Sequence, residues 1–166
     1  MSSHLEEFFR HNHWANLRLI DWCASLDDDL LDSNAPGTFG DARRTLVHLV
    51  GAEEVYVALL TGETMDEADR LHLDGPFPGL KTLRERVAAS GEKLIELAVK
   101  TPFDAVLRGT APNGAPYTER GTALLLQAIH HAAEHRTHIM TVISQHGIDV
   151  PETSGWTYGD EELTID

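Results

Sequence analysis

Apolar residues recur at helical spacing in four long segments, and we predict a helix in each of them. The first covers about residues 3–26, and its apolar stripe holds Leu5, Phe8, Phe9, Leu19, Ile20 and Cys23. The other three cover about residues 39–61, 80–100 and 121–146. Residues that end helices follow each of these three, namely Gly62, Pro102 and Gly147.

The connecting segments predict one small hairpin and otherwise loops. Asn113-Gly114 lies between short extended stretches before the fourth helix, and this dipeptide is typical of a tight hairpin. The tail after Gly147 is polar apart from Trp156 and Tyr158, and we expect it to lie across the bundle surface. The fold predicted is all-α: an up-and-down four-helix bundle with a small β-hairpin insertion before the last helix, in a single domain over residues 1–166.

Composition narrows the classes of partner. The chain has 166 residues and a formal net charge of -14, which argues against nucleic acid or an anionic membrane as a partner, because both are polyanions. It has no apolar run of the length that spans a membrane. The first ten residues, MSSHLEEFFR, are acidic where a secretory signal would be basic and then apolar, so we expect a cytoplasmic protein.

The cysteine count limits the chemistry of any metal site. Cys23 is the only cysteine, so the chain can form neither an intrachain disulfide nor a zinc site of paired thiolates. A metal site would therefore use histidine, aspartate or glutamate. We expect Cys23 to be a small buried apolar residue.

Four histidines lie within the segment IHHAAEHRTHI, residues 129–139. His131 and His135 are four residues apart, so both point to the same face of a helix. That face also carries the apolar residues Leu124, Ala128, Ile139 and Val142. Imidazoles that face a protein interior need partners for their nitrogens, and a divalent metal is one such partner. A solvated helix face is the alternative interpretation.

His48 is the candidate for a third ligand. It lies on the apolar face of the second predicted helix, together with Ala52, Val55, Tyr56 and Leu59. Three histidines with an open coordination position are typical of a catalytic metal site. A hydrogen-bonded core histidine is the other interpretation of His48. His130 lies about a quarter turn from the ligand face, and we expect it to face solvent.

The same residues carry a family resemblance that covers nearly the whole chain. HNHWANLRLIDWCASL resembles the opening helix of the DinB/YfiT-like family, and TFGDARRTLVHLVGAEEVYVALLTG is similar to its second helix. IHHAAEHRTHI resembles its His-x-x-x-His-Arg motif, and GIDVPETSGWTYGDE resembles its tail. The motifs occur in the family's order. The translesion DNA polymerase that shares the name is unrelated.

The resemblance implies a four-helix bundle, a homodimer, and a zinc or nickel ion bound by His48, His131 and His135. The family often has glutamine where this chain has His138, which makes His138 a group that supports a ligand or faces the substrate. Characterised relatives include thiol-dependent transferases and isomerases, so the resemblance implies a small-molecule substrate and a low-molecular-weight thiol.

A metal held by three neutral imidazoles would lower the pKa of a bound water or thiol, so two reactions stay open. The first hypothesis is a thiol-dependent S-transferase acting on small electrophiles, and the alternatives are a metal-dependent hydrolase or a non-catalytic metal-bound stress-response dimer. We expect Asn12 and Asn16 to face the site, as partners of backbone or histidine nitrogens or as contacts to a substrate. Glu53 and Glu134 are interpreted as surface carboxylates rather than general bases.

Overall fold

The computed structural model describes residues 3–163 and confirms a helical bundle with a hairpin insertion. Four long helices form the bundle: α1 (His4–Cys23), α2 (Ala42–Thr61), α3 (Leu80–Lys100) and α4 (Gly121–Ser144). Two short 3-10 helices, η1 (Asp28–Asp32) and η2 (Glu67–Asp69), lie in the connections. The hairpin is formed by β1 (Val106–Thr110) and β2 (Pro116–Arg120), and a last helix, α5, covers Gly155–Glu162.

Local signals in the sequence account for several helix ends. The Ser3 side chain accepts a hydrogen bond from the backbone N–H of Glu6 and caps α1. Asp41 caps α2 in the same way through the N–H of Arg44. Gly62 closes α2 with a φ of 74°, a left-handed conformation that favours glycine.

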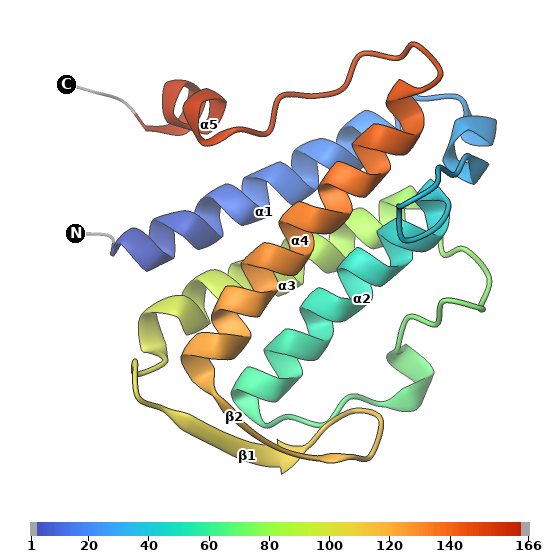
Figure 1. Ribbon diagram of the computed structural model, residues 1–166. Helices are drawn as coiled ribbons and strands as arrows, with labels where there is room; N and C mark the ends of the chain where they lie inside the picture. Colours follow the sequence, from blue (N-terminus) through green and yellow to red (C-terminus); the bar gives the residue numbers. More distant parts are fainter. Residues whose placement is uncertain (1–2, 164–166) are drawn as a thin grey trace.

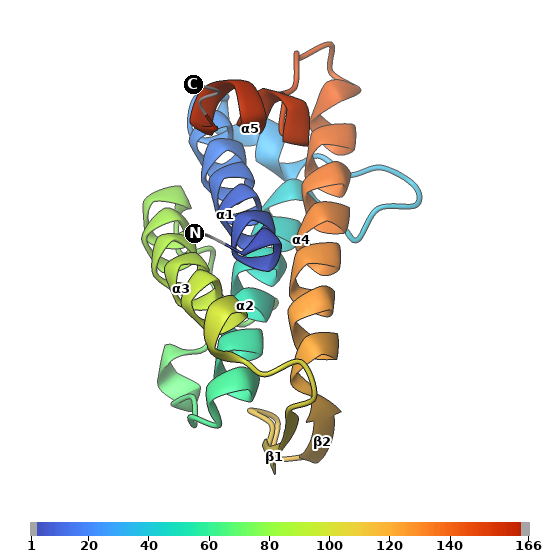
Figure 2. The same ribbon diagram turned by 90° about the vertical axis from the view of Figure 1, so that its left-hand side faces the viewer.

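The helices do not alternate in direction around the bundle. Figures 1 and 2 show α1 and α4 running one way and α2 and α3 running the other way. The connection between α2 and α3 makes them parallel, because it returns along the side of α2: Leu71 lies against Gly51, and Asp74 accepts a hydrogen bond from Arg44 at 3.0 Å. The helical bundle with its hairpin insertion is confirmed, but its helices run up, down, down and up in sequence order, whereas those of a simple up-and-down bundle alternate.

The hairpin lies beyond the ends of α2 and α3 (Figure 1). Its strands pair antiparallel from Val106 opposite Arg120 to Thr110 opposite Pro116. The predicted turn is present, with Gly114 at a φ of 83°. The Tyr117 hydroxyl donates a hydrogen bond to the carbonyl of Leu59 at 2.7 Å, which fastens the hairpin to the end of α2.

The tail lies on the bundle surface as predicted, and its second half is helical. The Tyr158 hydroxyl donates a hydrogen bond to Glu7, and Arg18 pairs with Glu161, so α5 is held against α1. Trp156 is 87% exposed. Neither Tyr158 nor Trp156 lines the cavity described below.

The bundle core is formed by inward-facing aliphatic residues, and Cys23 is buried among them as expected. Phe8 was predicted to share the buried stripe of α1, which is wrong: its side chain is 60% exposed, while Phe9 is buried. Consecutive helical residues point about 100° apart, and at this end of α1 that angle turns Phe9 towards the core and Phe8 away from it. None of the helices within residues 3–163 has the length and apolar character needed to cross a membrane.

Candidate metal centre

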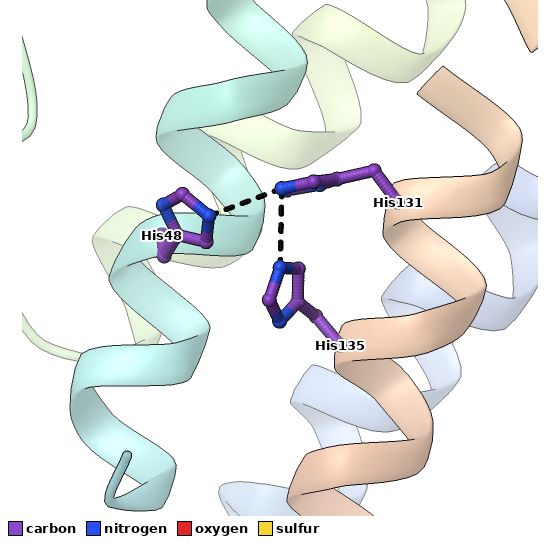
Figure 3. Close-up of side chains that lie close together, drawn as sticks. All are labelled: His48, His131 and His135. Carbon is purple, nitrogen blue, oxygen red and sulfur yellow. Dashed lines mark hydrogen bonds between the residues drawn. The ribbon is translucent and has the colours of Figure 1, made fainter. Parts of the chain in front are cut away.

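Three histidine side chains from two helices meet at one point. His48 projects from α2, and His131 and His135 project from successive turns of α4 (Figure 3). The Nε2 atom of His131 lies 3.0 Å from Nε2 of His48 and 3.1 Å from Nε2 of His135. His135 is buried, and the other two are half-buried. The structure therefore brings together the three predicted ligands, which we call the three-histidine cluster.

Hydrogen bonding alone cannot satisfy this convergence. A neutral imidazole carries one N–H donor and one acceptor lone pair. The Nε2 of His131 can use only one of these, yet it faces two other Nε2 atoms. Because three Nε2 atoms share only two states, at least two of them must both be donors or both be acceptors, so the three cannot all pair with one another. A cation at the meeting point would accept a lone pair from all three nitrogens.

Distances and protonation both fit a divalent metal. One candidate ligand atom from each histidine lies within 4.8 Å of the others. Two nitrogens on a tetrahedral zinc ion, with bonds of about 2.0–2.1 Å, lie roughly 3.3 Å apart. Burial, reinforced by the neighbouring imidazoles, lowers the pKa of His131 and of His135 to about 4. Burial also lowers the pKa of His48. All three rings are thus neutral near pH 7, as metal ligands must be.

Two aromatic rings flank the cluster. Phe39, in the loop before α2, stacks on His48 with ring centroids 4.2 Å apart and an interplanar angle of 8°. Its edge also meets His135, at 5.0 Å between centroids. Tyr56 packs edge-on against His131 from α2. These rings limit the positions that the imidazoles can adopt and cover part of the cluster from water.

His138 lies behind one of the candidate ligands. Its Nδ1 atom is 3.4 Å from Nδ1 of His135, one turn earlier on α4. If His135 binds a metal through Nε2, its Nδ1 carries the proton and can donate it towards His138. Partners of this kind fix the tautomer and orientation of a metal-binding histidine. His138 is not one of the three converging side chains.

Asn12 and Asn16 lie in a second, separate polar cluster. Nη1 of Arg136 donates hydrogen bonds to Oδ1 of Asn12 at 2.8 Å and to Oδ1 of Asn16 at 2.6 Å. Nδ2 of Asn16 donates to Glu53 at 2.7 Å, and the Ser90 hydroxyl donates to the other Glu53 oxygen at 2.8 Å. We call these five residues the interhelix network, because they join α1, α2, α3 and α4.

The interhelix network contains two buried ionisable groups, Glu53 and Arg136. Glu53 was interpreted as a surface carboxylate, which is wrong: it is only 3% exposed. Burial raises its pKa to about 7, against hydrogen bonds from Ser90 and Asn16 and the charge of Arg136. Burial likewise lowers the pKa of Arg136 to about 10. Glu134 is exposed, as expected.

The network and the three-histidine cluster are linked through the backbone. Arg136 directly follows His135 on α4, so its buried hydrogen bonds to α1 help to fix the rotation of the helix that carries two of the histidines. The structure records no hydrogen bond from Asn12 or Asn16 to a histidine within residues 3–163. Their direct contact with a cofactor or substrate stays a prediction.

A cavity of about 430 Å³ lies beside the three-histidine cluster, and His48 and His131 form part of its wall. Ala52, Val55 and Tyr56 of α2 form one side. The returning connection forms the other side, with Met65, Arg70, Leu71, His72 and Leu73. The apolar face predicted for the second helix is therefore partly the wall of a cavity rather than helix-to-helix packing.

Three residues of this region, Glu53, Phe39 and Arg70, were not predicted from the sequence to lie near the site. Glu53 continues the spacing of the buried residues Leu46 and Val50, so a helical stripe could have indicated its burial. Phe39 and Arg70 lie in loops, where no periodic pattern predicts which side chains turn towards the site. Their positions follow from tertiary structure.

A comparison with known families agrees with this geometry. A sequence profile described as the DinB family matches residues 1–164. A search of curated proteins found no significant match. The profile covers the bundle helices that carry both polar clusters, together with the hairpin and α5. The chain therefore belongs to the DinB family.

Proposed function

We propose that this protein is a metal-dependent enzyme that transfers a low-molecular-weight thiol to a small electrophile. The observation that carries the proposal is the convergence of the His48, His131 and His135 Nε2 atoms beside a cavity large enough for a small molecule. A purely structural metal site has no need of such a cavity. Membership of the DinB family, together with the thiol-dependent relatives noted above, supports the same proposal.

The three imidazoles would hold the ion and leave its charge uncompensated. A bound zinc or nickel ion would lower the pKa of a thiol or water and so supply a nucleophile near neutral pH. Either a thiolate or a hydroxide would offset the charge of the ion, and the softness of sulfur as a ligand favours the thiol. Phe39 and Tyr56 would keep the rings in place and exclude water from part of the cluster.

A metal-dependent hydrolase is the second candidate, because the same three ligands serve water activation. A non-catalytic metal-bound dimer is the third. In the thiol reaction a sulfur–carbon bond forms, the leaving group departs with its electron pair, and the thiol proton passes to solvent. In hydrolysis water supplies the new oxygen–carbon bond instead. The two reactions can therefore be distinguished by their products.

The test uses protein loaded with cobalt, whose visible absorption reports its ligands. Mercaptoethanol with a haloalkyl electrophile tests thiol transfer, and a nitrophenyl ester tests hydrolysis. We expect thiol to change the cobalt spectrum and the thioether to form, with both lost in His131→Ala and retained in His130→Ala. Ester turnover without a thiol response would favour the hydrolase, and neither reaction would favour a non-catalytic site.

We also infer that the protein is a homodimer. The inference rests on the family resemblance, and the exposed apolar side chains Phe8 on α1 and Leu126 on α4, at 60% and 66%, are consistent with it. Sedimentation at micromolar concentration should give twice the mass of 18.3 kDa. A monomer under those conditions would contradict the inference.

A further inference from the structure

The cavity beside the three-histidine cluster has an unusual charge for this protein. The chain carries a formal net charge of -14, yet no carboxylate within residues 3–163 lines the cavity. Among the described residues that line it, the one permanently charged group is the guanidinium of Arg70. The remaining wall is mostly apolar, from Ala52 and Val55 on one side to Leu71 and Leu73 on the other.

Arg70 is held in place but keeps donors free. Its side chain is 24% exposed, and its Nη1 atom donates to Glu67 at 2.6 Å and to the Pro112 carbonyl at 3.3 Å. Its Nη2 and Nε atoms make no hydrogen bond to any residue in the described range 3–163. A guanidinium with two adjacent donors free matches the two oxygens of a carboxylate.

The wall that carries Arg70 is anchored to the bundle. Arg86 of α3 pairs with Glu54 of α2 and also donates a hydrogen bond to the Asp69 carbonyl at 2.6 Å. Leu71 approaches α2 at Gly51, where an added Cβ would lie 3.3 Å from the Leu71 side chain. Arg70 is thus positioned by contacts on both sides of it in the sequence, as a binding residue requires.

We propose that this cavity binds a small carboxylate with an apolar body, its carboxylate on Arg70 and its other end towards His48 and His131. This inference rests on the proposed function and names the class of molecule: a carboxylic acid whose far end carries the thiol. Glu67 is the group that competes for Arg70, and because its side chain is 69% exposed, that pair is weak. The acid would replace a weak surface contact with one inside the cavity.

Two probes of equal length separate the carboxylate from the thiol. Mercaptohexanoate and mercaptohexanol differ only at the end expected to meet Arg70. Binding of each is measured on cobalt-loaded protein by calorimetry and by the visible spectrum. We expect the acid to bind on the order of 10-fold more tightly than the alcohol, because a charge-assisted pair replaces a neutral contact.

Three variants assign that preference to the cavity. Arg70→Gln should remove the preference for mercaptohexanoate, while mercaptohexanol should bind with an affinity within about 2-fold of that for the unmodified protein. Glu67→Gln should strengthen the binding of mercaptohexanoate, because it removes the carboxylate that competes for Arg70. Ala52→Leu should weaken both probes by filling the cavity. Arg84→Gln, which removes a surface arginine paired with Asp21, is the matched control and should change neither.

The outcomes separate this inference from the proposed function. An unchanged preference in Arg70→Gln would overturn it, as would an equal loss of both probes with a lowered melting temperature, which would indicate a structural role. If the protein takes up no cobalt, the proposed function fails, and hexanoate and hexanol are compared on the metal-free protein. Binding of hexanoate that depends on Arg70 would still support the carboxylate subsite, and its absence would overturn it.

Discussion

Two polar clusters lie within one bundle, and they differ in how their polar atoms are satisfied. In the interhelix network, Arg136, Glu53 and their three partners are each 6% exposed or less, and the oxygens of Glu53, Asn12 and Asn16 all accept hydrogen bonds. In the three-histidine cluster, three nitrogens meet without a set of hydrogen bonds that satisfies them all. Only the second cluster borders the cavity.

This difference indicates that the interhelix network stabilises the fold and that the three-histidine cluster is suited to binding a ligand. A satisfied buried network stabilises one arrangement of helices, because any shift leaves a charge without its partners. Convergent lone pairs are unfavourable until a ligand binds them. Burial of polar groups therefore does not by itself mark a functional site, whereas the convergence of polar atoms that cannot satisfy one another does.

Breaking the interhelix network should have the largest effect on stability. Glu53→Ala would leave Arg136 buried without a counter-charge, and we expect the free energy of unfolding to fall by about 3–5 kcal/mol. Glu134→Ala, on the exposed face of α4, is the control and should change it by less than about 0.5 kcal/mol. Urea unfolding of metal-free protein measures both. Similar values for the two variants would mean that the network adds little to stability.

The two clusters should respond to acid with opposite signs. The pKa of His131 and of His135 is about 4, against an ordinary 6.5, so between these values the unfolded chain binds protons that the folded chain does not. Their contribution to stability is therefore lost as the pH falls through that window. The pKa of Glu53 is raised from 4.5 to about 7, so its contribution grows as the pH falls from 7 to 4.5.

Unfolding of metal-free protein at several pH values tests these signs. Replacing both His131 and His135 with glutamine should flatten the loss of stability between pH 6.5 and 4. Glu53→Gln should make that loss steeper, because it removes the opposing contribution. If the free energy of unfolding of both variants changed with pH as it does in the unmodified protein, the assignment of the pH response to these groups would be contradicted.

His138 should have the smallest of these effects. Removing a partner that orients a metal-binding histidine weakens metal affinity by about 10-fold to 100-fold, and the 3.4 Å contact with His135 places His138→Ala at the lower end. His138→Asn, which keeps an acceptor, should lose less. Competition with a chelator measures zinc affinity, and an unchanged value in His138→Ala would exclude the supporting role.

Much of the fold could be predicted from local patterns. The apolar stripes correctly predicted that α3 begins at Leu80 and α4 at Gly121, and Asn113-Gly114 predicted the hairpin. These predictions were possible because helical periodicity and turn chemistry are properties of neighbouring residues. The parallel course of α2 and α3 could not be predicted, since the connection between them has no periodic pattern. Its path depends on contacts such as that of Leu71 with Gly51.

The candidate site, like the fold, could be predicted from the sequence only in part. His131 and His135 could be paired from their spacing, and His48 from its place on an apolar face, because each histidine interrupts a helical stripe. The burial of Glu53 and the role of Asn16 depend on Arg136, which lies far away in sequence and near only after folding. Arg70 reaches the cavity through a loop, where sequence spacing carries no such information.

Titration of zinc into metal-free protein by calorimetry tests the central claim most directly, with His48→Ala and His130→Ala as a matched pair. His48 is one of the three converging histidines, and His130 is exposed on the same helix as the other two. We predict one zinc ion per chain in the unmodified protein and in His130→Ala, and none at micromolar concentration in His48→Ala. Zinc binding by His48→Ala with the affinity of the unmodified protein would contradict a metal centre formed by these three residues.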